Sequence, residues 1–154
     1  MTIQEMGALG EMIGGFAVVI SLIYVGLQVR QNSNSVRASS QIALRQLGTE
    51  ITSQLAAPDM ARIYIQGLKD LSPLPAEDRV RFHSLMFSLF GIYEAYYFQE
   101  YFGIIPQEFL PRYDQALFHL RQPGVKQWWD SGGRDQFSDK FVENLEQAQE
   151  KPAA

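Results

Sequence analysis

The stretch MIGGFAVVISLIYVGLQV, residues 12–29, carries no charged side chain and decides the fold. A helix needs about 20 apolar residues, with a range of about 17 to 25, to cross a bilayer. These 18 residues lie at the lower edge of that range, with Ser21 and Gln28 as their polar members. A buried core helix and a helix that docks into a soluble partner are the alternatives. Because no polar face interrupts the stretch before Gln28, we favour a single transmembrane helix.

The flanks of this stretch disfavour a signal peptide and suggest an orientation. Glu5 and Glu11 precede it, where a signal peptide has a basic segment. Arg30, Arg37 and Arg45 follow it, with no acidic residue among them. Because cytoplasmic flanks carry an excess of Lys and Arg, we expect a short external N-terminus and a cytoplasmic C-terminal domain.

Small side chains recur along the apolar helix at alternating spacings of three and four. They are Gly7, Gly10, Gly14, Ala17 and Ser21. Small residues let helix backbones approach closely in lipid, so this seam predicts a homo-oligomer. Glycine is also common in spanning helices, which is the plainer interpretation. The same register continues to Tyr24, Gln28 and Gln31, which would line a pore or vestibule or belong to a solvated helix; we favour the solvated helix.

Composition excludes several functional classes. The chain has 154 residues, a net charge of −4 and 46% hydrophobic residues. An acidic chain is no general nucleic-acid binder, so we expect no nucleic-acid partner. Cysteine is absent and histidine occurs twice, which excludes thiolate metal sites and disfavours histidine-rich ones. We expect no cofactor and no metal site.

The rest of the chain has helical signals and no strand pattern, so we predict an all-α fold. Residues 1–30 would form the transmembrane anchor, 31–57 a helical stalk with a weak point at NSNS (32–35), 58–150 a small helical bundle and 151–154 a tail. Within the bundle, helices are predicted from Asp59 to about Leu71 and from Pro75 to Phe102. Further helices are predicted from Pro106 or Pro111, around QPGVKQWW (122–129), and after Ser138 as the cap.

Two segments resemble a family of small bacterial proteins with an N-terminal apolar anchor. The first is VVISLIYVGLQVRQNSNSVRAS (18–39), with a Y-V-G-x-Q-x-R-x-N block at 24–32 and Arg37-Ala38 after it. The second is QPGVKQWW (122–129), a Pro-Gly-x-x-x-Trp-Trp element, followed by FSDKFV (137–142). The resemblance covers most of the chain. It implies a membrane-anchored helical fold, here in the bacterial inner membrane, and no particular chemistry.

Candidate chemistry is sparse. His83 and Glu94 lie three turns apart on one predicted helix, and Glu94 and Tyr97 lie in an aromatic setting that could line a pocket for a lipid or other hydrophobic molecule. The favoured interpretation of Glu94 is structural, with a tyrosine, Arg62 or Arg112 as its partner. Asp114 and His119 are five residues apart and share no face.

Trp128 and Trp129 suit either the core or a membrane interface, and we favour the core. We expect no catalytic residue and predict a non-enzymatic binding or scaffold protein at the membrane. Its partners would be the lipid bilayer and further copies of itself, with no other protein partner identified. An oligomeric pore is the alternative function, and an enzyme using Glu94 and His83 is a third.

Overall fold

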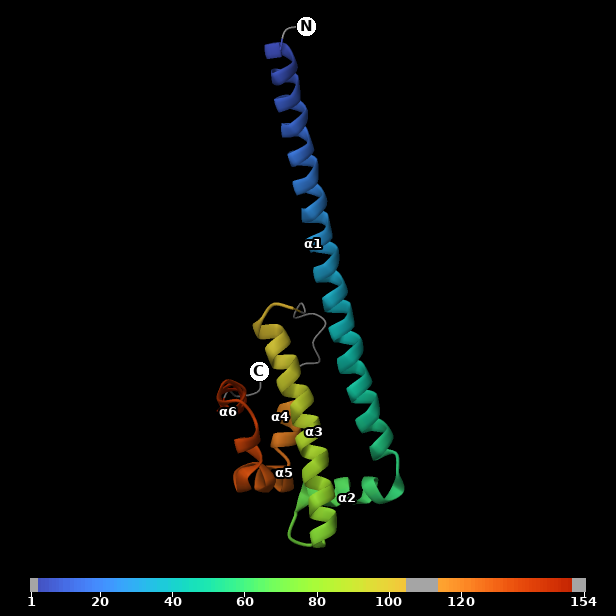
Figure 1. The fold of residues 1–154 in the computed structure, drawn as a ribbon. Coiled ribbons are helices and arrows are strands. Elements are labelled where there is room, and N and C mark those ends of the chain that lie inside the picture. Colours follow the sequence, from blue (N-terminus) through green and yellow to red (C-terminus); the bar gives the residue numbers. More distant parts are fainter. Residues whose placement is uncertain (1–2, 105–113, 151–154) are drawn as a thin grey trace. The chain divides into compact units, whose positions relative to one another are not determined.

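The structure is a computed structural model that describes residues 3–104 and 114–150. The chain divides into two compact units, Met1–Ser40 and Gln41–Ala154. The described residues are helical and contain no strand, as predicted: a long apolar N-terminal helix is followed by a small helical bundle (Figure 1).

The first unit consists of most of helix α1, which is Ile3–Leu55. The helix continues through NSNS without a break, and the hydroxyls of Ser33 and Ser35 donate to the carbonyls of Val29 and Gln31, one turn earlier. Among the described residues, α1 is the one helix long and apolar enough to cross a membrane. Its apolar side chains from Met12 to Val29 are exposed in the structure.

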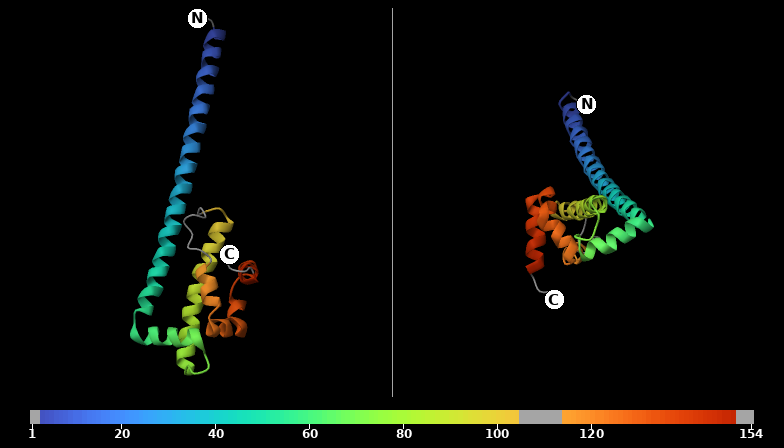
Figure 2. Two further views of the ribbon diagram at one scale, coloured as in Figure 1. Left: turned by 180° about the vertical axis from the view of Figure 1, so that it is seen from behind. Right: turned by 90° about the horizontal axis from the view of Figure 1, so that it is seen from below.

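The second unit contains the C-terminal part of α1 and the remaining helices. These are α2 (Pro58–Lys69), α3 (Ala76–Tyr101), α4 (Asp114–Leu120), α5 (Pro123–Trp128) and α6 (Asp139–Glu150). A π-helical turn (Trp129–Gly133) and a 3-10 turn (Arg134–Gln136) join α5 to α6. Helix α2 contacts α3 and α5, and runs across the end of the unit (Figure 2).

The helix boundaries in this unit follow the sequence signals closely. Pro58 opens α2, with Asp59 in its first turn and Lys69 in its last, which suits the helix dipole at both ends. Helix α3 begins directly after Pro75, with two acidic residues in its first turn. The predicted start of a helix at Pro106 or Pro111 lies outside the described residues, and α4 is described from Asp114.

An aromatic core holds α3 against the C-terminal helices. Phe82, Met86 and Phe90, spaced by four along α3, are fully buried. The ring of Phe90 lies 5.4 Å from that of Trp128 and 5.1 Å from that of Trp129, measured between centroids. Both tryptophans are buried, with 4% and 3% exposure. The core interpretation of this pair is therefore confirmed.

Two glycines set the closest approach between α2 and α5. A Cβ built on Gly124 would overlap the carbonyl oxygen of Gly67, and a Cβ on Gly67 would overlap the ring of Phe82. Both positions are buried. The helices pack backbone to backbone here, an arrangement that no larger residue permits.

Candidate functional site

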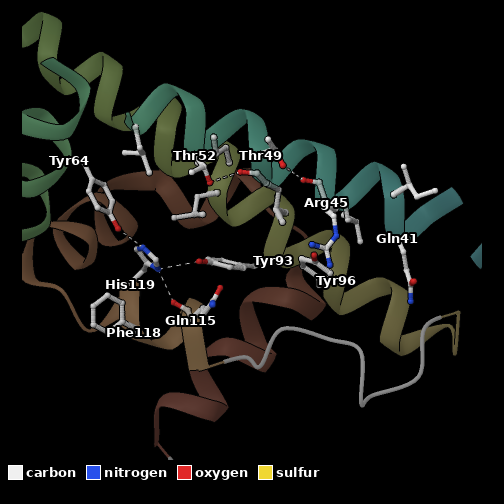
Figure 3. Close-up of a pocket in the computed structure, with 17 residues that line it drawn as sticks. Gln41, Arg45, Thr49, Thr52, Tyr64, Tyr93, Tyr96, Gln115, Phe118 and His119 are labelled. Carbon is white, nitrogen blue, oxygen red and sulfur yellow. Dashed lines mark hydrogen bonds between the residues drawn. The ribbon is translucent and has the colours of Figure 1, made fainter. Parts of the chain in front are cut away.

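The second unit contains a pocket with a volume of about 1120 Å³ (Figure 3). Small-molecule sites commonly have volumes of about 300 to 1,000 Å³, so the space suffices for a ligand. Four helices form its walls, and 17 lining residues are drawn in Figure 3. The lining residues are Gln41, Ile42, Leu44, Arg45, Gly48, Thr49, Ile51, Thr52, Leu55, Tyr64, Leu89, Ile92, Tyr93, Tyr96, Gln115, Phe118 and His119.

Helical periodicity explains which residues reach the pocket. On α1 the lining positions recur every three or four residues from Gln41 to Leu55, so they form one face of the helix. On α3 the contributing positions are 89, 92, 93 and 96, and on α4 they are 115, 118 and 119. Nine of the 17 lining residues have polar side chains, and apolar atoms supply the larger part of the wall's area.

His119 is the centre of the polar network in this wall. Its Nε2 lies 2.8 Å from the hydroxyl of Tyr64, and its Nδ1 lies 2.8 Å from the carbonyl oxygen of Gln115. The hydroxyl of Tyr93 lies 3.2 Å from the same Nδ1. Because a carbonyl only accepts, the pattern assigns the proton of the neutral ring to Nδ1, and Nε2 accepts from Tyr64. Figure 3 shows these contacts joining α2, α3 and α4.

Burial keeps this network uncharged. It lowers the pKa of His119 below the ordinary 6.5, against a smaller opposing effect of the bond to Gln115. Burial also raises the pKa of Tyr64, and burial with a smaller effect of Tyr64 raises the pKa of Tyr93. At neutral pH the ring is therefore neutral and both phenols keep their protons. Such a network holds the imidazole and both hydroxyls in fixed orientations through their mutual hydrogen bonds.

The charges around the pocket are unbalanced. Among the described lining residues there is no Asp or Glu, and Arg45 is the one permanent cation. Within the described part of the chain no carboxylate lies within ion-pair distance of Arg45. Its side chain extends from α1 toward Tyr96 on α3 (Figure 3). The pocket is thus apolar with a positive end.

The residues singled out from the sequence as pocket candidates lie elsewhere. His83 is exposed and its Nδ1 accepts a hydrogen bond of 2.9 Å from Trp128 Nε1. Glu94 Oε1 accepts from the backbone N–H and the hydroxyl of Ser138, at 2.8 and 2.7 Å. Tyr97 packs against the rings of Tyr101 and Phe141. None of the three lines the described pocket.

Glu94 has a structural partner, though a different one from those expected. Ser138 directly precedes α6, so the carboxylate of Glu94 satisfies a backbone N–H at the N-terminus of that helix. Arg62 instead pairs with Asp78 at 2.8 Å, and Arg112 lies outside the described residues. His83 and Glu94 therefore connect α3 to different parts of the chain, Trp128 and Ser138.

The predicted seam residues all lie on the exposed helix of the first unit. A Cβ built on Gly7, Gly10 or Gly14 would meet nothing within 4 Å. Ser21 donates its hydroxyl to the carbonyl of Ala17 at 2.8 Å. Ala17 and the further positions of the same register, Tyr24, Gln28 and Gln31, are likewise exposed.

The sequence reasoning missed Tyr64, His119 and Arg45 as pocket residues. His119 was considered beside Asp114, whereas its partners come from Tyr64, 55 residues away, and Tyr93, 26 residues away. The available signal was the spacing of Gln115, Phe118 and His119 on one helical face. The described residues contain no group of three or more His, Cys, Asp or Glu that could hold a metal ion.

Comparison of the chain with protein-family models, with curated proteins and with solved structures found no match.

Proposed function

We propose that this chain is a membrane-anchored, homo-oligomeric binding module. Residues 12–29 would serve as the anchor, and the second unit would bind an apolar small molecule in its pocket. The observation that carries the proposal is the pocket itself, a space of about 1120 Å³ whose wall combines a larger apolar area with defined polar side chains.

The properties of residues 12–29 support the anchor. Contiguous exposed apolar surface of this extent marks a membrane or protein contact. The backbone of this stretch is helical, and the hydroxyl of Ser21 is satisfied by its own helix. A bilayer requires both conditions, because unsatisfied polar groups are costly there. With the arginines after the span, the second unit would face the cytoplasm, in the inner membrane of a bacterium.

The anchor is testable by extraction of membranes. Full-length protein should stay in the membrane pellet after washing with alkaline carbonate and enter solution with detergent. A chain in which Ile20 and Ile23 are both replaced by Lys should be released by the wash, because charges in the middle of a span are costly. If the unaltered protein leaves the pellet in carbonate, the anchor is wrong.

The binding function is testable by filling the pocket. Gly48 lines it, and a Cβ there meets nothing within 4 Å, so Gly48→Phe should occupy the space without a clash. Native mass spectrometry of full-length protein released from membranes should show a bound small molecule that this variant loses. Gly26→Phe, at another open glycine far along α1, is the matched control and should keep it. A wild-type chain without any bound molecule would refute the function.

A further inference from the structure

The ligand chemistry follows from the unoccupied donors of the pocket wall. The hydroxyls of Thr49 and Thr52 donate to the carbonyls of Arg45 and Gly48, so neither hydrogen is available. The Nδ1–H of His119 is directed to Gln115, and Tyr64 donates to Nε2. The donors of these four residues are therefore satisfied within the protein and are not available to a ligand.

Three donors remain. The guanidinium of Arg45 has no acidic partner in the described part of the chain, and the hydroxyl of Tyr96 has no hydrogen-bond partner there either. Tyr93 lies beside the protonated Nδ1 of His119, so its oxygen faces a donor and its own hydrogen is free for another acceptor. Tyr93 and Tyr96 are one turn apart on α3, and Arg45 extends toward Tyr96 (Figure 3).

We infer that the pocket binds an amphiphile with an apolar tail and a singly charged oxyacid head, of which a long-chain carboxylate is the simplest. Arg45 and Tyr96 would hold the head, and the apolar faces of α1 and α3 would cover the tail. The inference rests on the proposed function, because it names the ligand class of the same pocket.

Charge complementarity favours an anion over a neutral or cationic amphiphile. A guanidinium offers paired donors in a geometry that matches a carboxylate. The described lining contains no acid that would neutralise Arg45 or attract a cationic head. The uncharged His119 network adds no repulsion. A neutral apolar compound would form no charge-assisted bond with Arg45, so it would gain less from this wall than an anion does.

The test compares two ligands that differ only in the head. Full-length protein in nanodiscs of phosphatidylcholine is titrated with hexadecanoic acid carrying ¹³C in its carboxyl group, and with hexadecan-1-ol labelled at the hydroxyl carbon. Empty nanodiscs give the background from partition into lipid. We expect a protein-bound carboxyl resonance and an affinity for the acid about 10-fold or more above that for the alcohol.

Substitutions at Arg45 and Tyr96 test whether these residues cause the preference for the acid over the alcohol. Arg45→Gln should remove the preference for the acid while leaving the alcohol bound, and Tyr96→Phe should reduce it. Arg37→Gln is the matched control, because Arg37 is an exposed arginine on the same helix that does not line the pocket. It should behave as the wild type. Thermal unfolding of each variant should stay within a few degrees of the wild type, because Arg45 is exposed.

The outcomes separate the inference from the proposed function. Equal binding of acid and alcohol, both lost in Gly48→Phe, would overturn the acidic head and leave an apolar binding module. A preference for the acid that survives Arg45→Gln would also overturn the assignment. If neither compound binds and the native protein carries no other molecule that Gly48→Phe removes, both the inference and the proposed function fail.

Discussion

Neighbouring tryptophans with almost identical burial have unequal hydrogen bonding. Trp128 donates from Nε1 to His83, whereas Nε1 of Trp129 is buried and has no hydrogen-bond partner among the described residues. The ring of Trp129 nevertheless stacks on Phe137, at 5.8 Å between centroids and 16° between planes. Ring packing therefore stabilises the buried position of Trp129, whereas burial of its unsatisfied indole N–H is unfavourable.

This difference predicts the order of two matched substitutions. Trp128→Phe loses apolar area and a hydrogen bond, whereas Trp129→Phe loses similar area and removes an unsatisfied donor. We expect Trp128→Phe to lower the free energy of unfolding by about 1 kcal/mol more than Trp129→Phe. Chemical denaturation of the two full-length variants measures the difference. Equal losses would show that the indole N–H of Trp129 is satisfied in solution.

His119 predicts a dependence of stability on pH. Its pKa is lowered in the folded chain from 6.5, so the unfolded chain binds more protons below that pH. The stabilising contribution is present above 6.5 and is lost as the pH falls through the folded pKa. Unfolding midpoints of the wild type should therefore fall between pH about 7.5 and about 5.5 more steeply than those of His119→Gln. Other titrating groups are common to both proteins and cancel, and parallel curves would refute the prediction.

At the scale of elements, the backbone contact between α2 and α5 is the feature that least tolerates a larger side chain. Gly124→Ala places a methyl group on the carbonyl oxygen of Gly67, which cannot move independently of its helix. We expect a loss of about 2 kcal/mol or more in the free energy of unfolding. The control is Gly91→Ala in α3, where a Cβ meets nothing within 4 Å. That variant should be neutral or gain up to about 1 kcal/mol, because alanine favours a helix.

The elements were largely predictable from the sequence, whereas the pocket was not. Pro58 and Pro75 mark helix starts through local chemistry, and each helix begins at or directly after its residue. Helix α6 begins directly after Ser138 as predicted, but the serine hydroxyl donates to Glu94 of α3. The expected weak point at NSNS is helical, and its serine hydroxyls bond to carbonyls of the preceding turn. The pocket needs faces of α1, α3 and α4 brought together, and such contacts between residues up to 55 positions apart have no local signature.

For the whole molecule, the exposed glycines permit a clean test of self-association. A Cβ at position 14 or at position 15 meets nothing within 4 Å among the described residues. Gly14 belongs to the predicted seam, and Gly15 points about 100° away around the helix. Gly14→Leu should dissociate the oligomer and Gly15→Leu should leave it intact. Native mass spectrometry from micelles gives the stoichiometry of each variant. Identical assemblies in both variants, or a monomeric wild type, would refute the prediction that the seam holds an oligomer together.

The prediction of fold class for the whole molecule succeeded for a simple reason. Eighteen uncharged residues in sequence and a remainder without alternating apolar positions leave few arrangements other than a long helix and a bundle. The orientation, the oligomer and the seam remain predictions, because they depend on a bilayer and on further copies of the chain. Insertion of α1 into a membrane also remains a prediction, although the helix is long and apolar enough to cross one.

The contact between Gly67 and Gly124 also constrains how this chain can evolve. A glycine codon becomes an alanine codon by one change at its second base, so mutation supplies this replacement continually. At most exposed glycines of α1 the change is harmless within the fold, since the added methyl group meets open space. At position 124 it forces α5 away from α2, and at position 67 it meets the ring of Phe82 on α3. Descendants of this chain should therefore keep both of these codons, whereas along α1 the fold tolerates the exchange and only the proposed seam would restrict it.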